Sequence, residues 1–335
     1  MITEAVPAAL ADQRLDRIVA LIGDVSRSEA AATIAAGGVR VDGVAASSGK
    51  VRLQEGQIVE VDPAAIPEPP LPVADTTVEF GVVYEDGDVI VVDKPPGLVV
   101  HPGAGNMDGT LVSGLLARYP DVAGVGGDPI RPGIVHRLDA GSSGLLVVAR
   151  TEEAAAALIE QFADHSATRR YDAVVWGVPD APHGIIDAPI GRDRGDPLKM
   201  AVVAGGRPAR TDYRVVGTYS APALVSRLEC RLETGRTHQI RVHLSSIDHP
   251  LVGDPTYSQR RPMLGLTRPF LHAAELAFDH PGSGERVTFT SPLAADLQTW
   301  LDAAEVCATI GVVVYGQGAS ARAMAAMPAR VKPSR

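Results

Sequence analysis

The hydrophobic positions near the N-terminus recur at the spacing of an α-helix. Apolar residues three or four positions apart predict a first amphipathic helix, and they are Leu15, Ile18, Val19 and Ile22. A second helix is predicted over Arg27–Ile34, because Ser26 can cap its first turn and Glu29 completes a capping box. Gly37-Gly38 suits the positions just after a helix and is expected to end it.

Strand signals follow these helices. Val39–Val44 predicts a β-hairpin, because Asp42-Gly43 supplies the two residues of a tight turn. Gln57–Val61 predicts a further strand. Short helices with a small sheet make a modest core, so we expect residues 1–62 to form a separate small module. The proline-rich segment 63–77 is predicted to be a semi-rigid linker.

Residues 78–303 carry mostly strand signals. The β-rich runs, bounded by Gly, Pro and Asp, are Val89–Val92, Leu145–Val148, Tyr171–Val175, Tyr213–Val216 and Leu224–Leu228. Helices are predicted at Thr110–Arg118 and at Glu152–Ala163, the second with Thr151 as its N-cap. The pattern predicts an α+β fold, in which flanking helices cover a large mixed or antiparallel sheet.

Composition narrows the class of protein. The chain has 335 residues, of which 45% are hydrophobic, so it can build a real core in more than one domain. It has two cysteines, Cys230 and Cys307, and no Cys-x-x-Cys pair, which argues against a zinc site or a disulfide framework. The N-terminus does not resemble a secretory signal, and no apolar run approaches the ~18 residues that span a bilayer. We expect a cytoplasmic, monomeric protein without a membrane partner.

The charge pattern is acidic overall and basic locally. The net charge of −9 does not exclude RNA binding, because affinity depends on where basic residues cluster. Arginines gather late in the chain, with His238 and His243 among them: Arg227, Arg231, Arg236 and Arg241. Residues 304–335 are predicted to be a disordered tail, basic from Val306 onward, in which Ile310–Tyr315 could add one strand.

The segment from Ile134 to Val148 is the most informative in the chain. Asp139 stands between two apolar runs of strand-like composition, after Arg137 and before a Gly/Ser-rich turn. A carboxylate in such a turn can bond backbone N–H groups and serve as a cap. It is also well placed for chemistry, because loops on a rigid scaffold often carry reacting groups.

The string His-Arg-Leu-Asp139 followed by Ser143-Gly-Leu resembles the signature of pseudouridine synthases that modify large-subunit ribosomal RNA, the RluA/RluD type. Three further segments match this family in order, and they are Val92–His101, Arg169–Ala173 and Leu232–His243. The resemblance implies that Asp139 is the catalytic carboxylate. Where the family commonly has Lys-Asp-Thr after the aspartate, this chain has Ala140-Gly141-Ser142.

The N-terminal module also resembles a known domain. Arg14-Leu15-Asp16, Ser26-Arg27-Ser28 and Gly38–Gly43 are similar to the S-four-like RNA-binding domain. The resemblance implies that RNA is the partner and that the basic residues of these motifs contact it, which are Arg14, Arg27 and Arg40. A packing or dimerisation module remains the alternative.

The resemblance assigns further roles in the second domain. Arg236 is implied as the partner that keeps Asp139 ionised, and Tyr171 as the residue that stacks on uracil. Thr237 is a candidate N-cap of a helix through Ile247. Arg137 is implied to fill the stack left by the flipped base, and Arg241 is a candidate RNA contact. The resemblance implies no cofactor, because conversion of uridine to pseudouridine neither gains nor loses an atom.

Other classes of protein remain open. A metal hydrolase would use His238 and His243, but five residues apart they do not form an adjacent ligand pair on a strand or a helix, so no metal is expected. A non-catalytic RNA-binding assembly factor would have no need for Asp139, Tyr171 and Arg236 together. A glycosidase would normally need two carboxylates across a sugar, and the sequence offers one well-placed candidate.

Overall fold

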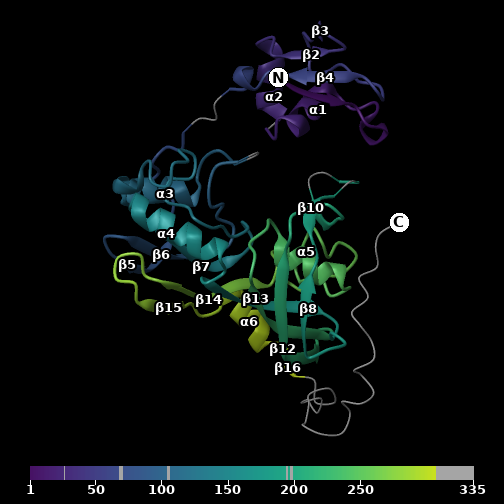
Figure 1. Cartoon of the computed structure of the whole chain (residues 1–335). Coiled ribbons are helices and arrows are strands. Elements are labelled where there is room, and N and C mark those ends of the chain that lie inside the picture. The colour runs from purple at the N-terminus through teal and green to yellow at the C-terminus, as the bar shows by residue number, and fades with distance from the viewer. Residues whose placement is uncertain (26, 68–70, 104–105, 194, 197–198, 307–335) are drawn as a thin grey trace. The chain divides into compact units, whose positions relative to one another are not determined.

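A computed structural model describes residues 1–306, apart from residues 26, 68–70, 104–105, 194 and 197–198 (Figure 1). The chain divides into two compact units. The first contains Met1–Val73 and His101–Asp108, and the second contains Ala74–Val100 and the residues from Gly109 onward.

The first unit contains a four-stranded antiparallel sheet in the order β1-β4-β2-β3, together with helices α1 and α2. The bounds are β1 Ile2–Ala5, α1 Leu15–Ile22, α2 Arg27–Ala35, β2 Val39–Val41, β3 Val44–Ala45 and β4 Ile58–Val61, with short 3₁₀ turns at Ala8–Leu10 and Pro63–Ala65. The two predicted helices, the hairpin and the strand at Ile58–Val61 are confirmed. Strand β1 was not predicted. The proposed N-cap Ser26 lies outside the described residues.

The geometry of the hairpin turn explains why the sequence predicted it correctly. Asp42 and Gly43 have φ angles of 51° and 78°, the left-handed conformation at both turn positions that this kind of hairpin requires. The carboxylate of Asp42 also accepts a hydrogen bond from the backbone N–H of Ile58 at 2.8 Å, which ties the turn to β4. Local chemistry therefore determines this part of the module.

The second unit is built on a ten-stranded sheet (Figure 1). Eight strands follow the order β16-β12-β13-β8-β14-β7-β6-β5, while β15 pairs with β14 and β9 with β12. The strand bounds are β5 Gly81–Glu85, β6 Val89–Lys94, β7 Ser143–Ala149, β8 Thr168–Trp176, β9 His183–Asp187, β12 Arg210–Ala221, β13 Val225–Leu232, β14 Leu271–Asp279, β15 Arg286–Thr290 and β16 Glu305–Val306. Because β7 and β14 are parallel and the other pairs are antiparallel, the sheet is mixed. This confirms one of the two predicted alternatives, a mixed rather than an antiparallel sheet.

Helices cover this sheet, as predicted for an α+β fold. The bounds are α3 Leu111–Arg118, α4 Glu152–Ala163, α5 Gln239–Ser246 and α6 Ala295–Asp302, with a 3₁₀ turn at Pro120–Val122 and a separate hairpin of β10 Ile190–Arg192 and β11 Met200–Val202. Thr151 caps α4 as predicted, because its side chain accepts from the N–H of Ala154. Alternate residues of β6 and β7 pack on opposite sides, toward α3 and toward α4. Burial on both faces explains why these strands are continuous apolar runs.

Three local expectations need correction. The run Ile134–Leu138 is not a strand, because the ring of His136 accepts the N–H of Val147 and only Ile134 forms an isolated bridge. Helix α5 begins at Gln239 rather than after Thr237, because its N-cap His238 has a left-handed φ of 58°. Residues 305–306 of the proposed tail pair with β12 as β16.

The rest of that tail, including the proposed strand Ile310–Tyr315, lies outside the described residues. Among the described residues, no helix combines the length and apolar character needed to cross a membrane.

Candidate active site

A buried lysine holds the turn that carries Asp139 in place. Lys94 ends strand β6, has no solvent exposure, and donates from Nζ to the carbonyl oxygens of Pro95, Leu98 and Ala140 at 2.8, 2.9 and 3.2 Å. The N–H of Gly97 donates to the same Ala140 carbonyl at 2.8 Å. Two loops far apart in sequence are therefore held together directly beside Asp139.

Burial lowers the pKa of Lys94 to about 7, although the charge of Asp139 opposes this shift. Burial of an amine disfavours its charged form, and a nearby carboxylate favours it. The ammonium form has three donors for the three carbonyls, so the anchor is complete only when the amine is protonated.

Asp139 is paired with Arg241. One Nη of Arg241 donates to the carboxylate of Asp139 at 3.2 Å, and the two side chains are 8% and 16% exposed. The same guanidinium makes a two-point contact with Asp254, at 2.7 and 3.0 Å, and Asp254 is fully buried. One arginine thus bridges two carboxylates, and this arrangement fixes the position of Asp139.

Arg241 is also supported by packing. Its guanidinium carbon lies 5.0 Å from the ring centroid of Tyr257. Burial would lower the pKa of Arg241, but the carboxylates of Asp254 and Asp139 outweigh it, and the pKa is raised. The cation between the two acids is therefore permanent over the physiological pH range.

The expectation that Arg236 pairs with Asp139 is wrong. Arg236 donates from Nε to the carbonyl oxygen of Pro208 at 3.0 Å, and its backbone N–H donates to the side chain of Gln239. Helix α5 starts at Gln239, so it directs Arg241, rather than Arg236, toward Asp139. The neighbouring acid Glu233 pairs with Arg210 at 3.3 Å.

Most of the candidate residues nevertheless share one cavity. A cavity of about 40 Å³ is lined by residues from four segments of the second unit, among them Arg137, Asp139, Arg169, Tyr171, Arg236 and Arg241. Tyr171 lies on β8, and burial raises the pKa of its hydroxyl. Arg137 is exposed. The cavity therefore combines a carboxylate, an aromatic ring and several guanidinium groups.

The basic candidates of the first unit share a single acid. Arg14 and Arg27 both form ion pairs with Asp16, which is nearly buried, while the two arginines are 39% and 57% exposed. Arg40 is exposed on β2.

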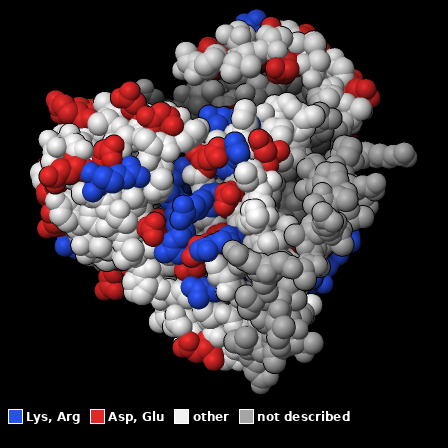
Figure 2. Space-filling model, turned by 60° about the horizontal axis from the view of Figure 1, so that its bottom comes forward, with Lys and Arg blue, Asp and Glu red and all other residues white. Residues whose placement is uncertain are grey.

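On the face shown in Figure 2, Lys and Arg gather in a central band with Asp and Glu among them. The chain thus presents local basic sites within an acidic whole.

The histidines of the metal alternative are engaged with protein atoms. His243 is buried, and its ring nitrogens lie 2.8 Å from the hydroxyl of Thr211 and 2.9 Å from the carbonyl of Ala188. His238 bonds the hydroxyl of Tyr257 at 2.9 Å. These contacts keep the two histidines apart in separate networks.

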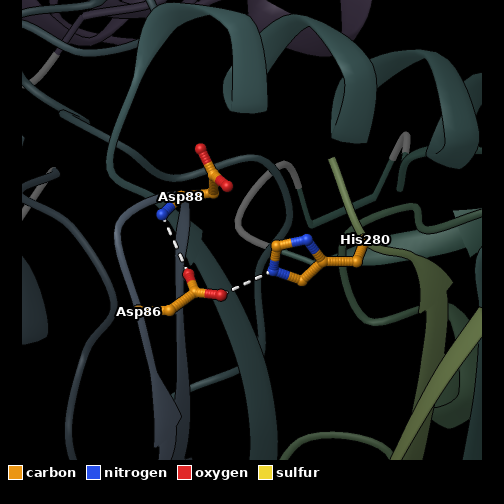
Figure 3. Close-up of side chains that lie close together, drawn as sticks. All are labelled: Asp86, Asp88 and His280. Carbon is orange, nitrogen blue, oxygen red and sulfur yellow. Dashed lines mark hydrogen bonds and ion pairs between the residues drawn. The ribbon is translucent and has the colours of Figure 1, made fainter. Parts of the chain in front are cut away.

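Among the described residues, the side chains of Asp86, Asp88 and His280 come close enough to share a metal ion (Figure 3). The oxygens of Asp86 already accept from the N–H groups of Asp88 and Val89, from the hydroxyl of Tyr84 and from His280. The other ring nitrogen of His280 accepts from Gly282 and Ser283. The cluster is a satisfied hydrogen-bond network that joins two loops.

Sequence reasoning missed Asp254 and Lys94 as parts of the site. Lys94 was included in a matching segment, and its place at the end of an apolar strand was an available signal. Asp254 follows the apolar pair Leu251-Val252, which also hinted at a buried acid. Neither signal identifies the partner, because the contacts are formed between distant segments.

The comparisons with known proteins show the family of the chain. The model of the RNA pseudouridylate synthase family matches residues 88–246, and the model of the S4 domain matches residues 13–59. A protein of Chloroflexus aurantiacus, named an uncharacterized RNA pseudouridine synthase, is 48% identical over 88% of this chain and 90% of its own length. Ribosomal large subunit pseudouridine synthase D of Pseudomonas aeruginosa is 44% identical over 88% of this chain and 93% of its own length.

A solved structure shares the fold. Human RNA pseudouridylate synthase domain containing 1 superposes with a TM-score of 0.54 at 26% identity, covering 76% of this chain and 97% of that chain. The fold and the matches define an RNA-modifying enzyme with an added S4 domain. The chain belongs to the RNA pseudouridine synthase family, whose reaction isomerises uridine in RNA to pseudouridine.

Proposed function

We propose that the enzyme modifies large-subunit ribosomal RNA and that Asp139 is its catalytic carboxylate. One observation carries the assignment of Asp139: its carboxylate lines a cavity with Tyr171 while Arg241 holds it in place. The relative of Pseudomonas aeruginosa, which is named for the large ribosomal subunit and aligns with 88% of this chain, supports the substrate.

The proposed reaction needs few groups. The bond between ribose C1′ and uracil N1 breaks, the base rotates, and C5 forms the new bond to C1′ while its proton is lost and N1 gains one. Asp139 acts as a nucleophile or as a base at the sugar, or attacks the uracil ring. Because atoms and electrons balance within the nucleotide, we propose that no cofactor takes part.

The other candidate residues have supporting roles in this proposal. Tyr171 stacks on the flipped uracil. Arg137, exposed at the cavity, replaces the base in the RNA stack or contacts a phosphate. Arg236 binds backbone phosphate, which suits a partly exposed guanidinium. In the S4 domain, Arg14, Arg27 and Arg40 contact the RNA outside the cavity.

Pseudouridine mapping tests the substrate. Ribosomal RNA from cells with and without this gene is compared at single-nucleotide resolution, and the lost sites are then restored with the wild-type gene. We expect specific positions in large-subunit RNA to depend on the gene and on Asp139. If the dependent positions lie only in transfer RNA or messenger RNA, the proposed substrate is wrong.

We also propose that residues 1–62 fold as an RNA-binding domain, joined through residues 63–77 to a catalytic domain over 78–303, and that the enzyme acts as a monomer in the cytoplasm. The two compact units support separate folding. Limited proteolysis is expected to cut first between Asp62 and Val78, because such linkers expose their backbone. Protection of this stretch, with earlier cuts elsewhere, would contradict the boundary.

A further inference from the structure

Arg169 is a buried cation in the active-site cavity that has no acidic partner. It lies on β8, is only 7% exposed, and lines the cavity with Asp139 and Tyr171. No carboxylate pairs with it among the residues that the structure describes. Its Nε has no hydrogen-bond partner there, and Nη2 donates two long hydrogen bonds, to the carbonyl oxygens of Leu232 and Glu233 at 3.5 and 3.4 Å.

The guanidinium of Arg169 is positioned by packing rather than by ion pairs. Its central carbon lies 5.0 Å from the ring centroid of Phe162. A Cβ on Gly235 would come within 2.8 Å of Nη1, so the backbone before Arg236 closes tightly over the guanidinium. The cation therefore has a defined place in the wall of the cavity.

The next residue of β8 provides the contrast. Arg170 points to the other face of the sheet, where its guanidinium is within 3.8 Å of Asp172 and Glu229 and 3.3 Å from Glu275. Arg170 thus has three acidic partners, whereas Arg169 has no acidic partner among the described residues. An unpaired buried charge costs free energy of folding, so its retention in a cavity points to a ligand that supplies the missing negative charge.

The positive field of Arg169 reaches its neighbours. Burial, followed by the charge of Arg169, lowers the pKa of His136 to about 3. Burial raises the pKa of Tyr171, and the charge of Arg169 opposes this shift. The cation therefore acts on the aromatic hydroxyl that faces the same cavity as Asp139.

The depth of Arg169 distinguishes two negatively charged partners. RNA phosphates stay near solvent, where exposed arginines such as Arg137 can bind them. A side chain that is 7% exposed lies too deep in the cavity for a backbone phosphate and is placed for a group that enters the cavity. We propose that Arg169 donates to a carbonyl oxygen of the flipped uracil and stabilises the negative charge that uracil carries after its bond to ribose breaks. This inference rests on the proposed role of the cavity as the uridine site.

The electron balance supports this assignment. When the N1–C1′ bond breaks, its electron pair leaves with uracil and is shared by N1 and the two carbonyl oxygens. When C5 then bonds to C1′, that pair forms the new bond and the negative charge disappears. A fixed cation favours the charged intermediate over the neutral substrate, which is the requirement for faster reaction.

Arg169→Met tests the inference, with Arg170→Met as the matched control on the adjacent position. We expect Arg169→Met to lower kcat by about 100-fold, the loss that follows removal of one donor to a developing anion. The dissociation constant for RNA should stay within a factor of about three, because the lost contact forms mainly after bond cleavage. Arg170→Met should keep kcat, and Arg169→Lys should lie between Arg169→Met and the wild type.

Chemical rescue separates charge from structure. Guanidinium ion added to Arg169→Ala is expected to restore part of the lost kcat, while urea, which has nearly the same shape and no charge, should not. Thermal unfolding adds a second criterion, because replacing a buried unpaired charge with an apolar side chain is neutral or stabilising. Arg169→Met should therefore melt no lower than the wild type.

The inference is overturned by several results. They are an unchanged kcat in Arg169→Met, a loss seen only in RNA affinity, equal rescue by urea, or a large fall in melting temperature. All ratios are measured on whichever RNA the wild-type enzyme modifies, so a different substrate RNA would not affect them. If the Asp139 variant loses activity while Arg169→Met keeps it, the proposed function stands and the proposed role of Arg169 is wrong.

Discussion

The two units use the same ionic groups in opposite ratios. In the S4 domain, one nearly buried acid, Asp16, pairs with two partly exposed bases, Arg14 and Arg27. In the second unit, one buried base, Arg241, pairs with two acids, Asp139 and Asp254. The three residues of the first cluster alone carry an excess positive charge, and the three of the second alone carry an excess negative charge, although Arg137, Arg169 and Arg236 also line the cavity beside Asp139.

The difference explains how an acidic protein can bind and modify RNA. At the surface, excess guanidinium groups are available to phosphates, and bulk water and salt weaken their mutual repulsion. In the cluster around Arg241, the low dielectric of the interior strengthens each contact between the guanidinium and the two carboxylates. The two clusters thus differ in their local ratio of acids to bases, which the net charge of −9 does not show.

The largest expected effect comes from removing the negative charge of Asp139. Asp139→Asn keeps the shape of the side chain but should lower kcat by about 10⁴-fold or more, as when a single catalytic carboxylate is neutralised. RNA affinity should be retained. Asp212→Asn on β12, outside the cavity, is the matched control and should turn over normally. Pseudouridine formation by Asp139→Asn at near the normal rate would mean that Asp139 is only a turn residue.

Removing the shared cation is expected to cost both stability and activity. Arg241→Met leaves the buried Asp254 and the partly buried Asp139 without a cationic partner and should lower the free energy of unfolding by about 3–5 kcal/mol. Arg236→Met loses a contact to a carbonyl oxygen and should cost about 1 kcal/mol or less. Urea unfolding of both variants compares them directly. Equal losses would show that the bridge between Asp139 and Asp254 adds little.

Arg236 and Arg241 also show how much of the site could be predicted from the sequence. Both belong to one motif, five positions apart, and the sequence favoured Arg236 through resemblance. The choice depends on where helix α5 begins, which the left-handed φ of His238 determines. Arg241 and Asp139 are 102 residues apart, so only the packed sheet brings them together. No local pattern contains that information.

Features with local causes were predictable. The Asp42-Gly43 turn and the Thr151 cap each depend on contacts within a few residues, and both are present. Strand β1 was missed because it is held by non-local pairing of Ile2 with Val61 rather than by its own composition. The general fold and the loop of Asp139 were therefore readable, whereas the pairing of charges was not.

The buried amine beside Asp139 should make stability depend on pH. Burial lowers the pKa of Lys94 to about 7 from its ordinary value of 10.5. Between these values the unfolded chain binds a proton that the folded chain does not, so this residue makes the free energy of unfolding rise with pH. Below the lower value both states are protonated and the dependence ends.

Lys94→Met removes this contribution. The advantage in unfolding free energy of wild type over variant should therefore grow between neutral pH and pH about 10. Urea titrations at both pH values measure it. Parallel pH profiles of the two proteins would show that the amine has an ordinary pKa in the fold.

The smallest effects are expected in the surface cluster, and they should have opposite signs. Arg27→Gln removes one excess positive charge, so the slope of log K against log salt for RNA binding should weaken by about one. Asp16→Asn releases Arg14 and Arg27 from their acid and should strengthen RNA binding severalfold at low salt. Because Asp139→Asn is expected to abolish turnover, the pair of Asp→Asn variants tests whether the ratio of charges separates the two sites. If Asp16→Asn weakens RNA binding as Arg27→Gln does, the acid is needed to hold the arginines in place, and the comparison between the two clusters fails.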